Sequence, residues 1–267
     1  MTKPNLSLFT AAVMMATGFL MLPGCEKTPA PAVEPEDNPA GNPGDKQEIV
    51  FTPQTYTFAN AERPYRKAEI GLKEGVTPAV VLYLHGGSRK GTDNGKQLEE
   101  PAVDAIAQYL RDKGISASFI VPQCPSTDSQ GKAMDWVKMA AALNYLITIT
   151  RTDTRAPVYI FGGSMGGTGT WNMLSQYPDL FTAAMPCAGN PKGCDPAAVA
   201  KTPFYTVMGG EDKVMKPETV NLQAFLDQVT AAGGTWEFDT EPLWDHEKTC
   251  TESYTTARLD WVFGRMP

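Results

Sequence analysis

The chain has 267 residues, of which 42% are hydrophobic and 20% are charged, and its formal net charge is −7. This length and apolar fraction are typical of one large globular domain with additional shorter segments. The acidic balance, without a stripe of basic residues, argues against nucleic acid as a partner.

Residues 1–24 are expected to form a lipoprotein signal peptide. Lys3 precedes an apolar segment, residues 6–22, which is too short and too rich in small residues for a retained transmembrane helix. The segment ends in Leu-Pro-Gly-Cys (residues 22–25), which resembles a bacterial lipobox. The resemblance implies export, cleavage before Cys25 and a lipid anchor on that cysteine. The acidic residue that follows favours the outer membrane, on its periplasmic side or at the cell surface. An ordinary secretory signal cleaved nearby is the alternative.

Residues 25–47 are expected to form a flexible tether. They contain five prolines together with acidic and small residues, and almost no bulky apolar side chain. Such a segment cannot bury enough apolar surface to offset the entropy of ordering it. The folded domain should therefore occupy residues 48–267, with the tether holding it away from the membrane.

From residue 48 onward, apolar segments typical of strands alternate with segments of helical pattern. Several strands are continuous apolar runs, as expected for parallel strands buried on both faces. The alternation predicts one α/β domain with a mostly parallel central sheet, helices on both faces, and a site at the carboxyl ends of the strands. Strands are predicted at 54–58, 66–70, 79–84, 117–121, 158–161, 183–185, 204–208 and 235–239. Helices are predicted at 98–112, 136–148, 168–176, 218–231 and 253–263.

The most informative stretch is Gly-Gly-Ser-Met-Gly-Gly at residues 162–167, which joins a predicted strand to a predicted helix. Glycine, any residue, serine, any residue, glycine in this setting is the nucleophile-elbow pattern. Glycine flanks the serine because the turn leaves no room for neighbouring side chains. The pattern predicts Ser164 as a nucleophile; the alternative is a glycine-rich turn with an idle serine.

A serine nucleophile needs a general base, and the base needs an orienting partner. The chain has only two histidines, His85 and His246. His85 follows the predicted strand at 79–84, where a structural role is expected of its ring. His246 lies after the last predicted strand and is expected to be the base.

The acid should follow a strand that lies between the serine and the base. Asp212, in the turn after the predicted strand at 204–208, fits this position. Glu211 is the nearest rival. Asp245 is bonded directly next to His246 and is badly placed to accept its ring N–H. Asp212 is therefore expected to fix the tautomer of the base and to stabilise its protonated form.

The negative charge that develops on a substrate oxygen during serine attack needs fixed hydrogen-bond donors. The backbone N–H of Met165, directly after the nucleophile, is one expected donor. Gly87, or Ser88 beside it, is expected to supply the other, since both follow a strand in a glycine-rich loop. A plain strand-ending turn is the alternative for this loop.

Together these residues resemble the α/β-hydrolase superfamily. The finer matches are His-Gly-Gly-Ser (85–88), Gly-Thr-Asp-Asn-Gly-Lys-Gln-Leu (91–98), Val-Pro-Gln-Cys-Pro (121–125), Gly-Gly-Thr-Gly-Thr-Trp (166–171) and Tyr-Pro-Asp-Leu-Phe-Thr-Ala-Ala (177–184). They are similar to the secreted phospholipase/carboxylesterase-like and "predicted peptidase" group, close to polyhydroxybutyrate depolymerases and to feruloyl and acetyl-xylan esterases of carbohydrate esterase family one. The resemblance covers about residues 56–262. It implies a single α/β-hydrolase domain without a cofactor and with a fairly open site, in which Ser164, Asp212 and His246 form the triad.

Four further residues are candidates for substrate contact. Trp244 lies two residues before the expected base, and aromatic faces stack on sugar or ferulate rings. Trp136 and Trp171 are weaker candidates, for which core packing is the alternative. Gln123 follows a predicted strand and is expected either to reach the cleft or to stabilise a turn.

Four cysteines remain when Cys25 is set aside, and an even number in an oxidising compartment suggests disulfides. Cys187–Cys194 is the favoured pair, with Cys124–Cys250 as the second, and free buried thiols are the alternative. No metal site is expected, because the chain has two histidines and no Cys-x-x-Cys pair.

The function that these features favour is a serine hydrolase that cleaves carboxylic esters through an acyl-enzyme. Export and tethering suit a protein that acts on polysaccharide-linked or small esters. A serine peptidase of the same fold is the first alternative. A catalytically silent lipoprotein that binds glycan is the second.

Overall fold

The computed structural model describes residues 48–265. The expected signal peptide, the lipidation site at Cys25 and the tether lie outside the described residues. None of the helices in the described range has both the length and the apolar character needed to cross a bilayer.

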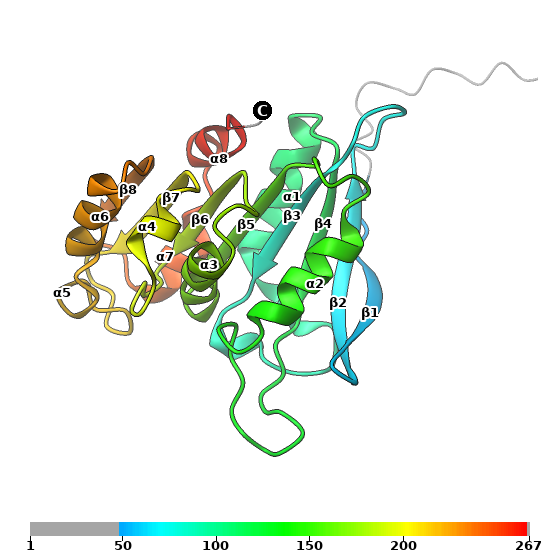
Figure 1. The fold of residues 1–267 in the computed structure, drawn as a ribbon, viewed down its shortest axis with the longest axis horizontal. Helices are drawn as coiled ribbons and strands as arrows, with labels where there is room; N and C mark the ends of the chain where they lie inside the picture. The colour runs from blue at the N-terminus through cyan, green and yellow to red at the C-terminus, as the bar shows by residue number, and fades with distance from the viewer. Residues whose placement is uncertain (1–47, 266–267) are drawn as a thin grey trace, which may run out of the picture. The chain divides into compact units, whose positions relative to one another are not determined.

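The core of the domain is an eight-stranded sheet in the order β1-β2-β4-β3-β5-β6-β7-β8 (Figure 1). The first two strands form an antiparallel hairpin, and β2 also pairs antiparallel with β4. All remaining pairs are parallel, which confirms the predicted mostly parallel α/β sheet. The strands are β1 (Thr52–Phe58), β2 (Ala61–Ile70), β3 (Ala79–Leu84), β4 (Ala117–Pro122), β5 (Val158–Gly163), β6 (Ala183–Cys187), β7 (Phe204–Gly209) and β8 (Trp236–Glu241).

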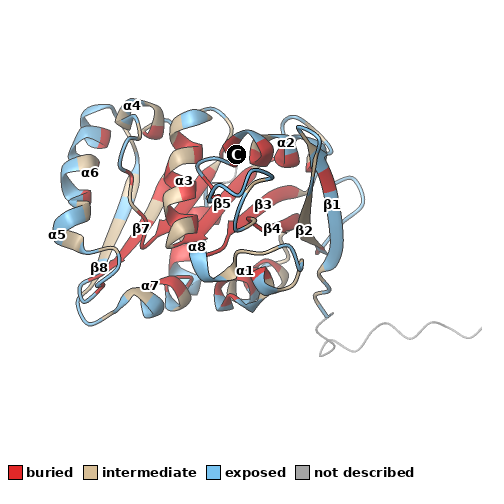
Figure 2. Cartoon of the chain, turned by 90° about the horizontal axis from the view of Figure 1, so that it is seen from below, coloured by how far each residue is buried: buried red, intermediate tan, exposed pale blue. Residues whose placement is uncertain are grey.

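Helices cover both faces of the sheet, because the central strands are apolar on both sides. In β3, Val80, Leu82 and Leu84 face one apolar layer, and Val81 and Tyr83 face the other. The first layer lies beneath α2 (Ala140–Thr150), α3 (Met165–Gln176) and α6 (Leu222–Ala231); the second lies beneath α1 (Pro101–Asp112) and α8 (Thr256–Phe263). Figure 2 shows buried residues concentrated in the central strands, whereas β1 is largely exposed.

The helices differ from their predicted bounds in physically simple ways. The predicted helix at 218–231 is divided into α5 (Pro217–Val220) and α6 by Asn221, whose φ of 47° is left-handed. The predicted helix at 98–112 is preceded by a separate 3-10 turn, η2 (Lys96–Glu99). A polar helix, α7 (His246–Glu252), and the short α4 (Pro196–Val199) had no apolar period that could reveal them.

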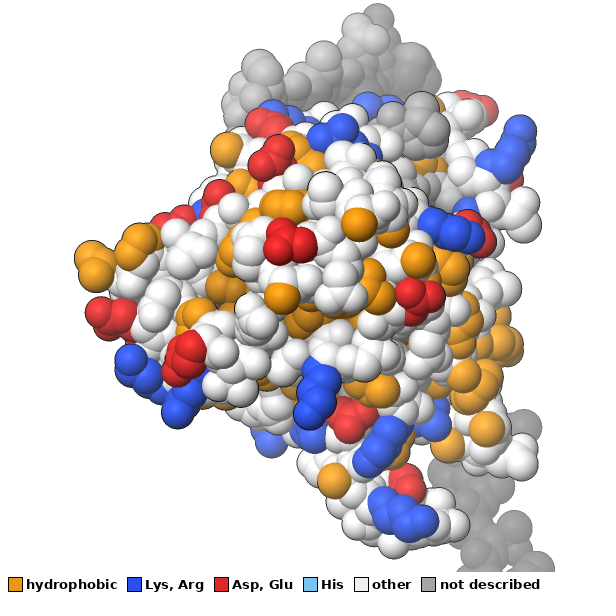
Figure 3. Space-filling model, turned by 60° about the vertical axis from the view of Figure 1, so that its left-hand side comes forward, with side chains coloured by type: hydrophobic (Ala, Val, Ile, Leu, Met, Phe, Trp, Pro, Cys, Tyr) orange, Lys and Arg blue, Asp and Glu red, His pale blue; other side chains and the backbone are white. Residues whose placement is uncertain are grey.

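Charged side chains of both signs are interspersed on the face shown in Figure 3. The carboxyl ends of the parallel strands β3 to β8, with the turns that follow them, lie along one edge of the sheet. This edge carries the residues from which the candidate site is built.

Candidate active site

Ser164 occupies a strained turn between β5 and α3. Its φ of 58° and ψ of −119° lie in a region that non-glycine residues rarely adopt. The backbone is held there from both sides, because Ser164 N donates to Cys187 O at 3.1 Å and Thr168 N donates to Ser164 O at 3.0 Å. Such strain is typical of a nucleophile elbow, in which the hydroxyl projects from the edge of the sheet.

The glycines around Ser164 are needed for close backbone approach. A methyl group on Gly166 would overlap the carbonyl oxygen of Leu84, at the end of β3. A methyl group on Gly162 would overlap the carbonyl oxygen of Gly166. The sequence of the turn is therefore dictated by how tightly α3 begins against the sheet.

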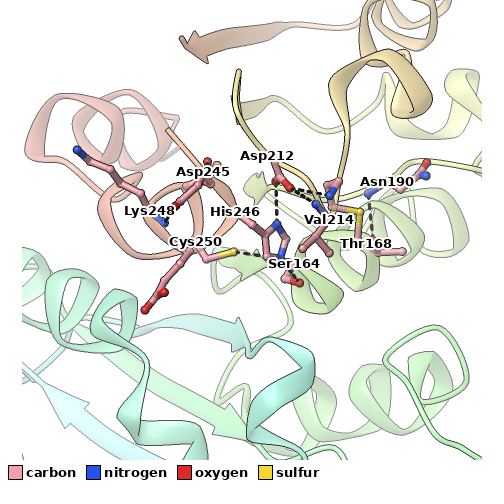
Figure 4. A network of polar contacts seen from close by, with 12 residues as sticks. Ser164, Thr168, Asn190, Asp212, Val214, Asp245, His246, Lys248 and Cys250 are labelled. Carbon is pink, nitrogen blue, oxygen red and sulfur yellow. Dashed lines mark hydrogen bonds and ion pairs between the residues drawn. The ribbon is translucent and has the colours of Figure 1, made fainter. Parts of the chain in front are cut away.

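The three side chains predicted as nucleophile, base and acid converge at this edge (Figure 4). Nε2 of His246 lies 2.8 Å from Ser164 Oγ, and Nδ1 of the same ring lies 2.7 Å from Asp212 Oδ2. His246 is the first residue of α7, and Asp212 lies in the turn after β7. The arrangement can carry a proton from the hydroxyl to the imidazole while the carboxylate holds the ring.

Asp212 is held rigidly in position. It is 2% exposed, and its Oδ1 accepts hydrogen bonds from Val214 N at 2.8 Å and Met215 N at 2.7 Å. Its other oxygen is thus left for the imidazole. The rival acids lie elsewhere: Glu211 is exposed, and Asp245 caps α7 by accepting from Lys248 N at 2.9 Å.

The expected oxyanion donors lie at the first residues of two helices. Met165 begins α3, and Gly87 begins η1 (Gly87–Arg89). The N–H groups of a first helical turn have no acceptor within their own helix. Gly87 and Ser88 line the same cavity as Ser164.

His85 supports this loop and takes no part in the contacts of Ser164. It is fully buried; Nδ1 donates to Gly86 O at 2.6 Å, and Nε2 accepts from Cys124 N at 3.0 Å. Burial lowers the pKa of His85 to about 4, so the ring is neutral at pH 7. The indole N–H of Trp136 donates to His85 O at 2.8 Å and so holds the start of the 85–88 loop in place.

The cavity beside Ser164 has a volume of about 590 Å³. It lies between the 86–89 loop, residues 99–101 and α7. The sequence did not place either Glu100 or Cys250 in this cavity. Glu100 stands just before a helix without any motif, and Cys250 lies one helical turn after His246, with Sγ 4.0 Å from Nε2 of that ring. Burial raises the pKa of the Cys250 thiol far above its ordinary value, so it is not a nucleophile at neutral pH.

The residues expected to contact substrate do not line this cavity. Trp136 and Trp171 are fully buried, so the interpretation of their rings as substrate contacts is wrong and core packing holds. Gln123 is also fully buried; it accepts from Asn94 N at 2.7 Å and donates to Arg89 O at 3.2 Å. It stabilises loops and does not reach the cleft. The ring of Trp244 lies within 5.6 Å of Lys248 Nζ and of Arg258 Cζ, and it lines a separate cavity with Tyr205 and Trp261.

The expected disulfides are absent, and Cys124, Cys187, Cys194 and Cys250 are free thiols. The favoured pair is wrong because its two members lie on opposite faces of the sheet. Cys187 belongs to the layer beneath α1 and α8, and Cys194 packs against the other layer. In the second pair, Cys124 is buried beneath α2, whereas Cys250 lies on α7 beside His246.

No group of three His, Cys, Asp or Glu side chains is arranged to hold a metal ion within residues 48–265. Nε2 and Nδ1 of His246 are instead paired with Ser164 and Asp212. The arrangement is thus suited to proton transfer and to stabilisation of an oxyanion by backbone donors.

No family model matches the chain. Feruloyl esterase B of Thermothelomyces thermophilus is 32% identical over 131 residues, which cover 48% of this chain and 44% of that protein. Feruloyl esterase B of Neurospora crassa is 30% identical over 131 residues, with the same shares covered. The chain thus spans less than half the length of the curated relatives it matches.

Solved structures share the fold. A thermostable esterase superposes with a TM-score of 0.68 and 22% identity, covering 80% of this chain and 62% of that one. The feruloyl esterase module of Clostridium thermocellum, in complex with sinapinate, superposes with a TM-score of 0.62 and 14% identity, covering 82% of this chain and 89% of that one.

Proposed function

We propose that this chain is a serine hydrolase that cleaves carboxylic esters, a proposal supported by its similarity to two feruloyl esterases and by the fold that it shares with solved esterases. The observation that carries the proposal is the continuous hydrogen-bonded path from Ser164 through His246 to Asp212. Each separation lies within the range of a good hydrogen bond.

In the proposed reaction, Ser164 Oγ attacks the ester carbonyl while Nε2 of His246 takes the hydroxyl proton. Negative charge on the carbonyl oxygen is stabilised by the N–H of Met165 and by that of Gly87 or Ser88, each donor being worth about 3 kcal/mol in the barrier. His246 then gives the proton to the departing alcohol, which leaves an acyl-enzyme. Water activated by the same imidazole releases the acid.

For the substrate, we propose polysaccharide-linked or small esters. The names of the two fungal relatives support an ester of a hydroxycinnamic acid as the first candidate. The cavity of about 590 Å³ lies within the usual range for small-molecule sites, roughly 300–1,000 Å³, and suits such an acyl group or a sugar ring. Anchoring through Cys25 to a bacterial membrane remains part of this proposal.

An active-site-directed fluorophosphonate tests the nucleophile. The wild-type protein should be labelled and Ser164→Ala should not; absence of labelling in both would favour a silent binding protein. A panel of p-nitrophenyl acetate, longer acyl esters, methyl ferulate and acetylated xylan tests the substrate class. Strong turnover of peptide anilides without turnover of any ester would favour the peptidase instead.

A further inference from the structure

Glu100 stands out among the residues around Ser164, because it is a buried carboxylate that the proposed reaction does not use. It is 8% exposed, and it lines the cavity beside the serine. It directly precedes α1 but its side chain does not cap that helix. Instead, Oε1 accepts a hydrogen bond from Gly86 N at 3.2 Å.

The carboxylate is close to the reacting atoms. A methyl group built on Gly86 would lie 3.4 Å from Glu100 Oε1 and 3.7 Å from Ser164 Cβ. Both side chains therefore lie close to the same glycine. Within residues 48–265, Glu100 Oε2 makes no hydrogen bond, so this oxygen is left to interact with a molecule in the cavity.

The charge of the cavity is dominated by acid. Three of its lining residues carry carboxylates, Glu99, Glu100 and Glu247, and one carries a cation, Arg89. The guanidinium is already paired with Glu99 at 2.7 Å, and its Nε lies 3.8 Å from Glu100 Oε1. Glu99 and Glu247 are exposed and therefore screened by solvent, so Glu100 is the buried carboxylate among the residues that line the cavity.

We propose that Glu100 selects substrates by charge, so that the site takes neutral or cationic esters and rejects esters that carry a carboxylate near the scissile bond. The proposal rests on the proposed esterase function and names the substrate class of the same site. At separations of about 7 Å and an effective dielectric constant of about 20, one buried unit charge alters relative rates by roughly tenfold or more.

The test compares Glu100→Gln with wild type on two matched pairs of esters. The first pair is the anionic p-nitrophenyl hydrogen glutarate and the neutral p-nitrophenyl valerate. The second is the cationic butyrylcholine and the neutral 3,3-dimethylbutyl butyrate. The amide oxygen of glutamine can still accept from Gly86 N–H, so the loop keeps its hydrogen bond. Because burial raises the pKa of Glu100, the measurements are made at pH 8, where the carboxyl is more fully ionised than at lower pH.

If the acyl half of the substrate enters the cavity, kcat/KM of wild type should be higher for the neutral valerate than for the anionic glutarate. If the alcohol half enters the cavity, kcat/KM should be higher for the cationic butyrylcholine than for the neutral dimethylbutyl ester. Glu100→Gln should shrink that ratio by roughly tenfold, while kcat/KM for the neutral esters changes much less. Glu62→Gln, an exposed carboxylate on β2, should leave both ratios as they are in wild type.

Ratios that are the same in Glu100→Gln as in wild type would overturn the charge selection, while hydrolysis of the neutral esters would leave the esterase proposal standing. A loss of neutral-ester turnover without a change in either ratio would show that Glu100 only positions the loop. Absence of hydrolysis of every ester by wild type would instead contradict the esterase function itself.

Discussion

Trp136 donates its indole N–H to the carbonyl oxygen of His85 at 2.8 Å, deep beneath the loop that carries the proposed oxyanion donors. Trp136→Phe should leave that carbonyl without its partner and loosen the loop. We expect a loss of about 1–2 kcal/mol in the free energy of unfolding, and a lower kcat for p-nitrophenyl acetate with little change in KM. Urea unfolding and steady-state kinetics provide the two measurements.

Trp171 offers a matched control for this prediction. It is equally buried, but its indole nitrogen makes no hydrogen bond. Trp171→Phe therefore removes a similar volume without breaking a bond to the loop, and kcat should remain close to that of wild type. Equal losses of kcat in the two variants would argue against a specific role for the bond to His85.

The second prediction concerns the pH dependence of stability. Burial lowers the pKa of His85 in the folded protein to about 4, from an ordinary value of 6.5. Between these values the unfolded chain binds the proton more readily, so the free energy of unfolding falls as the pH drops from 6.5 to 4. The contribution of this one group amounts to about 3 kcal/mol at the lower end.

His246→Ala isolates the titration of His85, because the chain has only two histidines. The remaining imidazole resonance in an NMR titration of the folded variant should have a pKa below about 5. The unfolding free energy of that variant should still decrease over the same pH interval. A ring that titrates near 6.5 would contradict the buried, neutral state of His85.

Much of the fold was predictable because its central strands are apolar on both faces. The helices were less so: α7 has the polar sequence His-Glu-Lys-Thr-Cys-Thr-Glu, and its start depends on a cap from Asp245. The order serine, acid, histidine predicted which three side chains the structure brings together. The burial of the Trp136 and Gln123 side chains was not predictable, because a side chain near the end of a strand can point either into the core or into the cleft. Cysteine parity likewise says nothing about which face of a sheet each thiol occupies.

The third prediction tests the close packing of the elbow. Gly166→Ala would place a methyl group against the carbonyl oxygen of Leu84, and backbone atoms cannot move aside as a flexible side chain can. We expect the free energy of unfolding to fall by about 3 kcal/mol, together with a large loss of esterase activity as Ser164 is displaced. An unchanged unfolding midpoint would show that α3 is packed less tightly against β3 than the structure indicates.

The fourth prediction concerns the thiols. Alkylation under denaturing conditions without reductant should modify Cys124, Cys187, Cys194 and Cys250, as shown by peptide mass spectrometry. The same reagent on the native protein should react slowly, because burial raises the pKa of Cys124 to about 12 and that of Cys187 to about 11. Detection of a cross-linked peptide between any two of these cysteines would contradict the free thiols.

The last prediction compares the proposed acid, Asp212, with Asp245, the carboxylate that directly precedes the proposed base in the sequence. Asp212→Asn keeps the shape of a side chain that accepts two backbone N–H bonds, but an amide no longer stabilises the protonated imidazole. We expect kcat for p-nitrophenyl acetate to fall by about 10³–10⁴-fold. Asp245→Asn is the matched control: its side chain caps α7, and asparagine caps helices equally well, so kcat should stay within a few-fold of wild type. A small effect at position 212 with a large one at position 245 would reverse the assignment, because the imidazole of His246 would then depend on the carboxylate that the structure directs away from it.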